Sequence, residues 1–329
     1  MELFAKPIIF FFLLILFTSW GFLACRTEDC GGQRVAYTII VDHYGRGKFS
    51  TVQAAIDSVP VNNFRWVKIH IRRGVYIEKV HVPFNKPCII LEGEGRGITT
   101  ITYNDREQTD RSATFISSPN NNSFDVLEPL VLNHGTLGSG TITQAVAAII
   151  YGDKSAFFDC GFVGFQDTLW DALGRHYFNN CIIQGAVDFI FGTGQSYYEG
   201  CLLNVTSAGF VTAQGRNSAN DPSGFVFRKC SVVGSGNGQV MLGRAYGSYS
   251  RVIFHGTYMG AVVNPQGWNS WHYIGQESKF SYAEVQCKGP GANTVGRVPW
   301  EKKLTGSQLK QFSKAYFINQ DGWLDKLPI

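Results

Sequence analysis

The chain has 329 residues, of which 44% are hydrophobic and 16% are charged, and its formal net charge is +4. This composition is that of a globular protein, and because it contains no dense run of lysine or arginine, a nucleic-acid-binding protein is a poor match. The mild positive excess favours a polyanionic partner through long-range attraction.

The first 24 residues have the pattern of a secretory signal peptide. Lys6 precedes an apolar run over residues 8–16, and small residues follow it, which predicts cleavage near residues 21–24. The run is short for a membrane span and has no stop-transfer flank, so the sequence favours secretion over a membrane anchor. Two glycosylation sequons, at Asn121 and Asn204, agree with this route.

Short strands dominate the expected elements of the first half. Strands are expected at residues 37–41, 66–71 and 88–91. A helix at residues 50–59, with a Ser/Thr start and a stop at Pro60, is expected to cap the open end of the fold. Residues 117–140 are the least regular stretch, which predicts a loop with a weak strand at 130–132.

The second half is more regular. A periodic core is expected from Thr143 to about Val263, and a helical pattern at residues 306–317 is expected to pack along its flank. No linker divides the chain after the signal segment. The sequence therefore predicts one domain over residues 25–329.

The periodic core repeats one short unit, in which an apolar strand ends in two mostly polar residues followed by a cysteine. The cysteine position is filled by Cys160, Cys181, Cys201, Cys230 and Thr257, at spacings of 21, 20, 29 and 27 residues. A period of this length predicts a parallel β-solenoid. Its coils stack and share one elongated core, because a single coil is too small to bury its own apolar face.

An aspartate follows each of the first two cysteines by seven residues, Asp167 after Cys160 and Asp188 after Cys181. Stacked strands lie about 4.8 Å apart, so equivalent positions of neighbouring coils come side by side. Two carboxylates that close cannot easily both ionise, and one pKa rises while the other stays low. The spacing predicts an acid beside an anion. Taken singly, Asp167 is also explained as a turn cap and Asp188 as a solvent-facing strand residue.

The eight cysteines permit disulfides in an oxidising compartment. The four in the repeated position are expected to point into the solenoid as small apolar residues. Cysteines on adjacent coils could also bridge, so the pairing stays open. No CxxC pair or His/Cys cluster has the spacing of a metal site, and no zinc site is expected.

Three further polar side chains could serve the aspartate pair. Gln166 is next to Asp167 and Gln144 lies one coil earlier, where amide donors would stabilise a developing oxyanion. Arg244 could keep one aspartate ionised through a charge-assisted hydrogen bond. Ordinary surface positions would explain all three equally well. The aromatic residues that could stack on sugar faces, or belong to the core, are Trp170, Phe191, Tyr246, Trp268 and Trp271.

Six motifs together resemble those of plant pectin methylesterases (pectinesterases). They are GVYIE at 74–78, QAVA at 144–147, GFQDTL at 164–169, DFIFG at 188–192, LGR at 242–244 and GRVPW at 296–300. The resemblance covers about residues 37–324. It implies an all-β fold, a single-stranded right-handed parallel β-helix (solenoid) with short capping helices. It also implies that residues 25–329 are the catalytic domain of a form without an inhibitor-like pro-region.

The resemblance further implies a role for each candidate residue. The catalytic set is Asp188 as nucleophile, Asp167 as general acid and then base, Gln144 and Gln166 as oxyanion donors, and Arg244 as the partner of Asp188. The positions that match the substrate groove are Trp170, Phe191 and Trp268, with Tyr246 where the family usually has a groove tryptophan.

The implied activity is hydrolysis of the methyl esters of homogalacturonan (pectin) to pectate and methanol. The resemblance implies a monomer that is secreted to the plant cell wall (apoplast) and needs no metal or organic cofactor. Pectin is the expected partner, together with a proteinaceous pectinesterase inhibitor. Neither nucleic acid nor, once the signal is removed, a membrane is expected as a partner.

Three alternatives remain open from the sequence. A β-helix pectate lyase would need carboxylates for Ca²⁺, and an inverting polygalacturonase would need carboxyls about 6.5–9.5 Å apart. The third is a catalytically silent pectin-binding wall protein. It is kept open because Ala245 and Tyr246 replace the usual Pro-Trp; in a separate departure, Ile149 and Ile150 stand where an arginine is usual.

Overall fold

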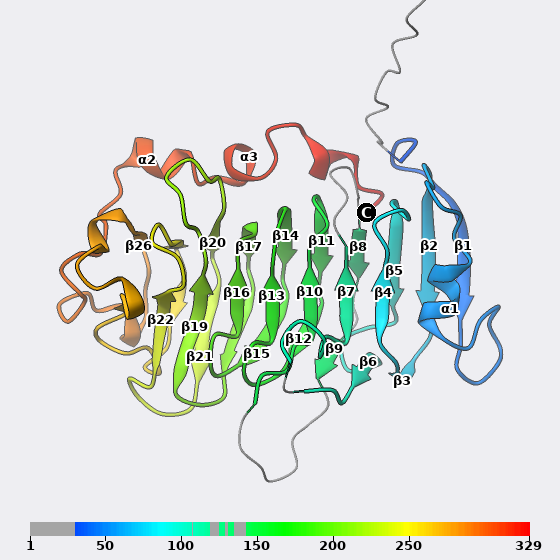
Figure 1. Cartoon of the computed structure of the whole chain (residues 1–329), viewed down its shortest axis with the longest axis horizontal. Coiled ribbons are helices and arrows are strands. Elements are labelled where there is room, and N and C mark those ends of the chain that lie inside the picture. Colours follow the sequence, from blue (N-terminus) through cyan, green and yellow to red (C-terminus); the bar gives the residue numbers. More distant parts are fainter. Residues whose placement is uncertain (1–29, 107, 119–124, 129–130, 135–142) are drawn as a thin grey trace, which may run out of the picture.

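Neighbouring coils of the chain pair strand on strand, and every such pairing in the described part of the chain is parallel. The computed structural model describes residues 30–106, 108–118, 125–128, 131–134 and 143–329. For 125–128 and 131–134 it describes only the backbone. The strands form three sheets that wind along one axis (Figure 1). Each full coil contributes one strand to each sheet, which makes the fold a right-handed parallel β-helix, as the sequence predicts.

The three sheets are called A, B and C, in the order in which each coil visits them. Sheet A contains β1 (Val35–Val41), β2 (Trp66–Ile71), β5 (Ile89–Gly93), β8 (Asp125–Glu128), β11 (Ser155–Phe158), β14 (Arg175–Asn179), β17 (Gln195–Glu199), β20 (Gly224–Arg228), β23 (Arg251–His255) and β26 (Ser281–Val285). Sheet B contains β3 (Gly74–Ile77), β6 (Thr99–Tyr103), β9 (Val131–His134), β12 (Gly161–Val163), β15 (Ile182–Gly185), β18 (Leu202–Val205), β21 (Ser231–Gly234) and β24 (Tyr258–Met259). Sheet C contains β4 (Val80–Val82), β7 (Phe115–Ser117), β10 (Ala148–Ile150), β13 (Leu169–Asp171), β16 (Ile190–Gly192), β19 (Gly209–Gln214), β22 (Val240–Ala245) and β25 (Trp268–Asn269).

The solenoid extends beyond the periodic core expected from Thr143 to about Val263. Strands from β1 to β26 continue the same three sheets, because backbone pairing between coils does not require the repeated cysteine. The weak strand expected at 130–132 corresponds to β9, which begins at Val131. The signal segment 1–24 and the sequon at Asn121 lie outside the described residues.

Helix α1 (Val52–Asp57) closes one end of the solenoid beside β1 and β2 (Figure 1). The Thr51 hydroxyl accepts a hydrogen bond from the Ala54 backbone at its start, and Val52, Ala55 and Ile56 are buried. Their burial covers the apolar interior that a solenoid exposes at its end. The expected capping helix is therefore present.

The helical pattern expected at 306–317 is divided into α2 (Gly306–Lys310) and α3 (Lys314–Phe317). The break turns Phe312 inward, where it packs with Phe317 on the outer face of sheet A. The short 3₁₀ helices are η1 (Trp271–Tyr273), η2 (Glu277–Lys279), η3 (Pro290–Ala292) and η4 (Trp323–Lys326). No helix in the described ranges is long and apolar enough to cross a bilayer.

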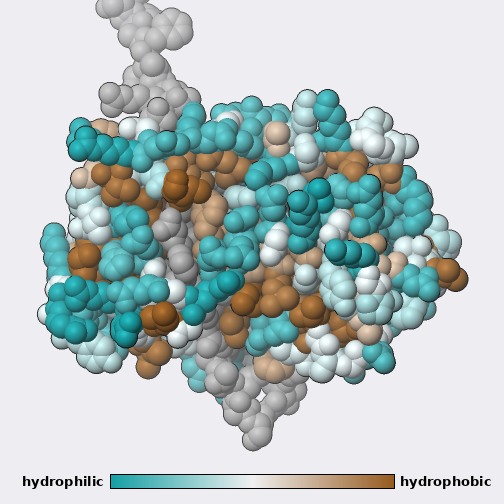
Figure 2. All heavy atoms as spheres, turned by 180° about the vertical axis from the view of Figure 1, so that it is seen from behind, coloured by the Kyte–Doolittle hydropathy of each residue, from teal (hydrophilic) through white to brown (hydrophobic). Residues whose placement is uncertain are grey.

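The C-terminal segment from α2 to η4 lies along the flank of the solenoid, as expected (Figure 1). Phe317 and Trp323 belong to the same apolar cluster as Tyr177 and Tyr197 of sheet A. Ion pairs attach the segment to the solenoid: Lys314 with Glu199 at 2.8 Å, and Asp321 with Arg175 at 2.8 Å and with Lys154 at 3.5 Å. Seen from behind the view of Figure 1, the surface mixes hydrophilic residues with separate apolar groups (Figure 2).

A ladder of stacked rings fills the interior. Phe157, Phe178, Tyr198, Phe227 and Phe254 follow one another in successive coils, with ring centroids 4.5–4.6 Å apart. This is about the spacing of paired strands, so the backbone ladder sets the stacking distance. The four cysteines of the repeated position are buried in the core and form no disulfide, as expected for small apolar residues.

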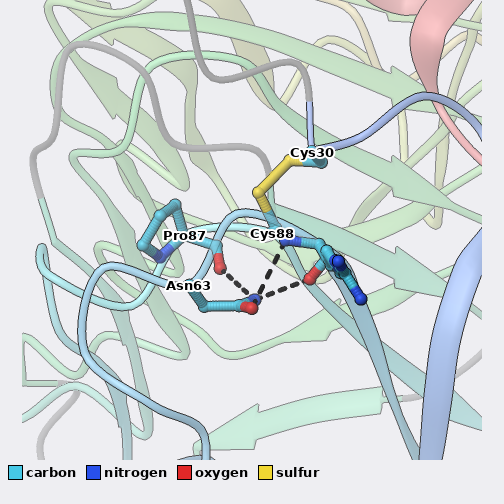
Figure 3. Close-up of a disulfide and its surroundings, with 5 residues drawn as sticks. Cys30, Asn63, Pro87 and Cys88 are labelled. Carbon is cyan, nitrogen blue, oxygen red and sulfur yellow. Dashed lines mark hydrogen bonds between the residues drawn. A yellow bond between two sulfur atoms is a disulfide. The ribbon is translucent and has the colours of Figure 1, made fainter. Parts of the chain in front are cut away.

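One disulfide joins Cys30, which precedes β1, to Cys88, which precedes β5 (Figure 3). The Asn63 carboxamide lies beside it and donates to Arg65 O at 2.7 Å and to Pro87 O at 3.0 Å. The disulfide therefore joins the segment just before β1 to the residue that precedes β5. This pairing could not be chosen from the sequence.

A fully buried polar network lies behind the outer face of sheet C. The Asp171 carboxylate accepts from the Tyr198 hydroxyl and binds His176 Nδ1, and His176 Nε2 donates to Gly152 O at 3.0 Å. Because each polar group has a partner, the network avoids the cost of burying unsatisfied donors. It also fixes the end of β13, which carries Trp170.

We expect Asp171→Ala to lower the free energy of unfolding by about 3–5 kcal/mol, because it leaves a buried hydroxyl and a buried imidazole without their acceptor. Chemical denaturation measures this loss. The control is Asp57→Ala at the exposed end of α1, which we expect to change stability by less than about 0.5 kcal/mol. Equal effects of the two substitutions would contradict the account of the network.

Candidate active site

Three consecutive coils place the candidate polar residues at the corner where sheet B gives way to sheet C. Isolated parallel bridges pair Gln144 with Gln166 and Gln166 with Val187. The next residue of each coil is Ala145, Asp167 and Asp188 respectively, and Asp167 N donates to Val187 O at 3.0 Å. The structure thus places the two aspartates in equivalent positions of neighbouring coils, which is the arrangement that their equal offset from the cysteines predicts.

Both aspartates have left-handed backbone conformations, with φ of 61° at Asp167 and 49° at Asp188. Few residues other than glycine adopt this conformation, and aspartate tolerates it because its short side chain bonds locally. Both side chains are nearly covered, with 6% and 4% of their surface exposed. Asp188 is therefore not the solvent-facing strand residue that it could have been when considered singly.

Burial and the neighbouring charge act differently on the two carboxyls. Burial, followed by the charge of Asp188, raises the pKa of Asp167 to about 7. Burial also raises the pKa of Asp188, but the hydrogen bonds and charge of Arg244 oppose that rise. The bound guanidinium therefore favours the ionised form of Asp188, whereas burial and the charge of Asp188 favour the protonated form of Asp167.

Arg244 reaches Asp188 from β22 and makes a two-pronged ion pair. Its Nε donates to Asp188 Oδ1 at 2.8 Å, and its Nη2 donates to Oδ2. The guanidinium carbon lies 4.0 Å from the ring centre of Trp271 and 4.6 Å from that of Phe210. These aromatic contacts restrict the guanidinium and strengthen its position by cation–π attraction.

The carboxamides of Gln144 and Gln166 have no hydrogen bond to any other residue that the structure describes. Gln144 is exposed and Gln166 is half-buried, on successive coils beside the acid pair. Their donors are therefore available to an oxygen atom bound next to the carboxylates.

Sequence reasoning missed two residues at this site and the role of a third. The Thr109 hydroxyl makes a long contact of 3.4 Å with Asp167 Oδ2, from a segment 58 residues away in the chain. Phe210 was not singled out, and Trp271 was considered only as a sugar-stacking residue. Nothing local in the sequence indicates these contacts, because each joins different coils.

Two of the predicted aromatic residues lie beside the acid pair on the outer face of sheet C. Trp170 and Phe191 are paired in register and stack with their ring centres 5.3 Å apart. Tyr246 is 52% exposed and its ring lies 4.9 Å from that of Trp271. These three side chains are accessible to a ligand on this face.

The placement of Trp268 in a substrate groove is wrong. Its side chain is only 1% exposed and stacks on Tyr282 in the core, with ring centres 4.6 Å apart. Trp268 pairs with Gly243, which has no side chain, so the indole fills the space above the glycine. Trp271, three residues later, is the tryptophan that reaches the site.

The chain matches the family described as Pectinesterase over residues 38–321. It is 44% identical over 307 residues to "Probable pectinesterase 29" of Arabidopsis thaliana, covering 88% of this chain and 90% of that protein. Among solved structures, the pectin methylesterase from carrot is similar with a TM-score of 0.81 and 32% identity, covering 87% of this chain and 94% of that one. The enzyme from Aspergillus niger is similar with a TM-score of 0.78 and 25% identity, covering 89% and 97%.

We expect Asp167→Asn to stabilise the protein at pH 8 by on the order of 2–4 kcal/mol. The folded-state pKa of Asp167 is raised to about 7 from 3.8, so stability contributed by its bound proton is present at low pH and is lost as pH rises toward 7. Asparagine does not ionise and removes that loss. Thermal unfolding at pH 4.5 and pH 8 tests this. If the difference in stability between the two proteins does not grow with pH, the surroundings of Asp167 do not raise its pKa.

Proposed function

Because the chain belongs to the pectinesterase family, and is thereby a carboxylic ester hydrolase that converts methyl-esterified pectin to pectate and methanol, we propose that Asp188 and Asp167 carry this reaction. The observation that supports the assignment is the unequal environment of two buried carboxyls on neighbouring coils. Of the two acids, Asp188 is the one that Arg244 hydrogen-bonds, while Asp167 has its pKa raised to about 7. One acid is prepared as an anion and the other as a proton donor.

In the first step, an Asp188 oxygen attacks the carbonyl carbon of the methyl ester and forms a tetrahedral intermediate. The Gln144 and Gln166 amides donate to the oxyanion that develops on the former carbonyl oxygen. The bond to the methoxy oxygen then breaks, and that oxygen takes the proton of Asp167. Methanol leaves, and the galacturonate carbonyl stays joined to Asp188 as an anhydride.

In the second step, Asp167 is ionised and accepts a proton from a water molecule that attacks the anhydride carbonyl. Asp188 is released as a carboxylate and Arg244 holds it again. The product is a free galacturonate carboxyl on the polymer, and Asp167 has regained its proton. Each proton that enters the cycle is accounted for.

The polymer would lie along the outer face of sheet C, across Trp170 and Phe191 and toward Tyr246. The stacked, half-exposed rings of β13 and β16 offer apolar faces to the sugar rings. Ile149, which stands where the family usually has an arginine, is 1% exposed and lies in the apolar cluster that also includes Trp170. Ile149 therefore packs beneath the rings of Trp170 and Phe191 and offers no charge to the substrate.

We also propose that residues 1–24 are a secretory signal, that residues 25–329 form the catalytic domain, and that the mature enzyme acts as a monomer in the cell wall. The Cys30–Cys88 disulfide supports passage through an oxidising compartment. A proteinaceous pectinesterase inhibitor is the partner that would compete with pectin at the aromatic face of sheet C. N-terminal sequencing of the secreted protein locates the cleavage.

We expect Asp188→Asn to lower methanol release from esterified pectin by about 10⁴-fold or more, because the nucleophile is lost. Gln166→Ala should cost about 10²–10³-fold, as for one oxyanion donor. Asp57→Asn, an exposed acid on α1, is the control and should leave the rate unchanged.

The same assay separates the alternatives. A lyase would give an ultraviolet-absorbing unsaturated product, a polygalacturonase would release reducing ends, and a silent binding protein would release neither methanol nor sugar. Full methanol release by the Asp188→Asn protein would refute the assigned nucleophile.

We further propose that Phe210 and Trp271 are positioning residues that hold Arg244 against Asp188. Trp271→Leu should lower kcat about 10-fold and move the acidic limb of the kcat/KM profile to higher pH. The sign follows because Arg244 opposes the burial that raises the pKa of Asp188, so a loosened guanidinium lets that pKa rise.

The control for this substitution is Tyr316→Leu, which removes an exposed ring 5.2 Å from the Lys310 ammonium and far from the acid pair in the sequence. It should leave the pH profile in place. A Trp271→Leu protein with weaker substrate binding but an unmoved acidic limb would mean that Trp271 serves only the sugar.

A further inference from the structure

We propose that the corner between sheets A and B carries a second binding site, for the carboxylate groups of de-esterified galacturonan. The inference rests on the proposed function, because that reaction would produce this polyanion. Each coil passes from sheet A to sheet B to sheet C, and the acid pair lies at the corner between B and C. The second site therefore occupies a different edge of the same solenoid.

A hollow of about 510 Å³ marks this corner. It is lined by Arg228, Lys229, Cys230, Ser231, Gly256, Tyr258 and Lys288. Three of these residues are cations and none is an acid. A hollow lined by one sign of charge raises the local concentration of the opposite ion.

The repeat of the solenoid explains why the hollow exists. Lys229 has a φ of 52°, and the corresponding residues one coil before and one coil after it are Gly200 and Gly256, with φ of 66° and 62°. Neither glycine has a side chain: the space at Gly200 is open, and at Gly256 the Arg228 guanidinium lies where a Cβ would stand. Tyr258 is paired in parallel with Ser231 and bridged to Lys288, which brings three successive coils together around that space.

Within the described part of the protein, no acid forms an ion pair with the cations of the hollow, and the charge of Arg228 acts on Glu199 only at longer range. The side chains of Arg228, Lys229 and Lys288 make no hydrogen bond or ion pair with another described residue. The acid paired with Arg228 one coil earlier is Glu199, and its carboxylate accepts from Lys314 Nζ at 2.8 Å and from the Tyr177 hydroxyl at 2.6 Å.

The remaining titratable neighbour adds no compensating charge. His255 follows in the same position as Arg228 in the next coil, and burial together with the charge of Arg228 lowers its pKa. Three cations in one hollow repel one another, and an anion bound from solution would remove that repulsion.

The hydroxyls of the hollow suit a carboxylate on a sugar. The Ser231 and Tyr258 hydroxyls have no hydrogen bond to another described residue, and Tyr258 is 39% exposed. A hydroxyl donates to a carboxylate oxygen, and an exposed aromatic ring offers an apolar surface to a sugar. Cations, hydroxyl donors and a ring therefore lie together in one place.

The charge also decides which pectin would bind. A methyl-esterified galacturonate is neutral and gains little from three cations, whereas each hydrolysed residue carries a carboxylate. The corner would thus bind a de-esterified stretch of the galacturonan chain while an esterified stretch of the polymer binds at sheet C. Binding at two sites raises the effective concentration of the remaining esters near the acid pair.

The chain itself supplies a conservative variant for the test. Arg228→Asn with Lys229→Asn reproduces the Asn179–Asn180 pair, which occupies the same two positions two coils earlier, and Asn180 has a φ of 53° against 52° for Lys229. The backbone therefore tolerates the change. The matched control is Lys48→Asn with Lys326→Asn, which removes the same charge from exposed positions elsewhere.

Binding is measured by titration calorimetry with fully de-esterified galacturonan oligomers, in the Asp188→Asn background so that no ester is turned over. We expect the corner variant to bind them about 3- to 10-fold more weakly at low salt, with the difference shrinking as salt is added. The control variant should match the parent. Fully esterified oligomers should bind the parent and the corner variant equally.

Three results would overturn the proposal. An equal loss in the control would show that net charge alone matters, and an equal loss for esterified oligomers would show that carboxylates are not recognised. An equal loss for a sulfated glucan would show a site for any polyanion. If the Asp188→Asn protein still releases methanol, the catalytic assignment fails, while the comparison of corner and control variants still decides this proposal.

Discussion

The backbone hydrogen bonds between neighbouring coils are the constraint on which every other feature depends. They hold equivalent positions of successive coils side by side, at about the spacing of paired strands. The stacked rings of Phe157, Phe178 and Tyr198 follow that spacing in the interior. At the corner between sheets B and C, the same spacing brings together two carboxyls, Asp167 and Asp188, that are 21 residues apart in the sequence.

Burying two ionised carboxyls side by side is unfavourable, and the two acids have different environments that reduce this penalty. A guanidinium binds both oxygens of Asp188 and favours its charged form, whereas burial and the charge of Asp188 raise the pKa of Asp167 and favour its protonated form. The asymmetry originates in one residue of β22, two coils beyond Asp188. Phe210 and Trp271 then limit how far that residue can move.

At two positions where the chain departs from the family pattern, the replacing side chain packs against its neighbours. Tyr246 replaces a tryptophan, but its ring still lies against Trp271 and stays exposed beside Arg244. Ile149 replaces an arginine and is buried in the apolar cluster below Trp170. Neither change touches the acid pair or its guanidinium, so the altered segment does not favour a silent binding protein.

The sequence by itself determined the solenoid and the adjacency of Asp167 and Asp188, because both follow from a short repeat whose apolar and cysteine positions are local. It also indicated Gln144, Gln166 and Arg244 as candidates. It did not determine which tryptophan reaches the site, how Cys30 pairs, or that Thr109 and Phe210 contact the catalytic candidates. Those contacts join coils separated by connections of unequal length. Only the tertiary structure sets the register across such connections, and register decides whether a side chain such as Trp268 points into the core or, like Trp271, toward the acid pair.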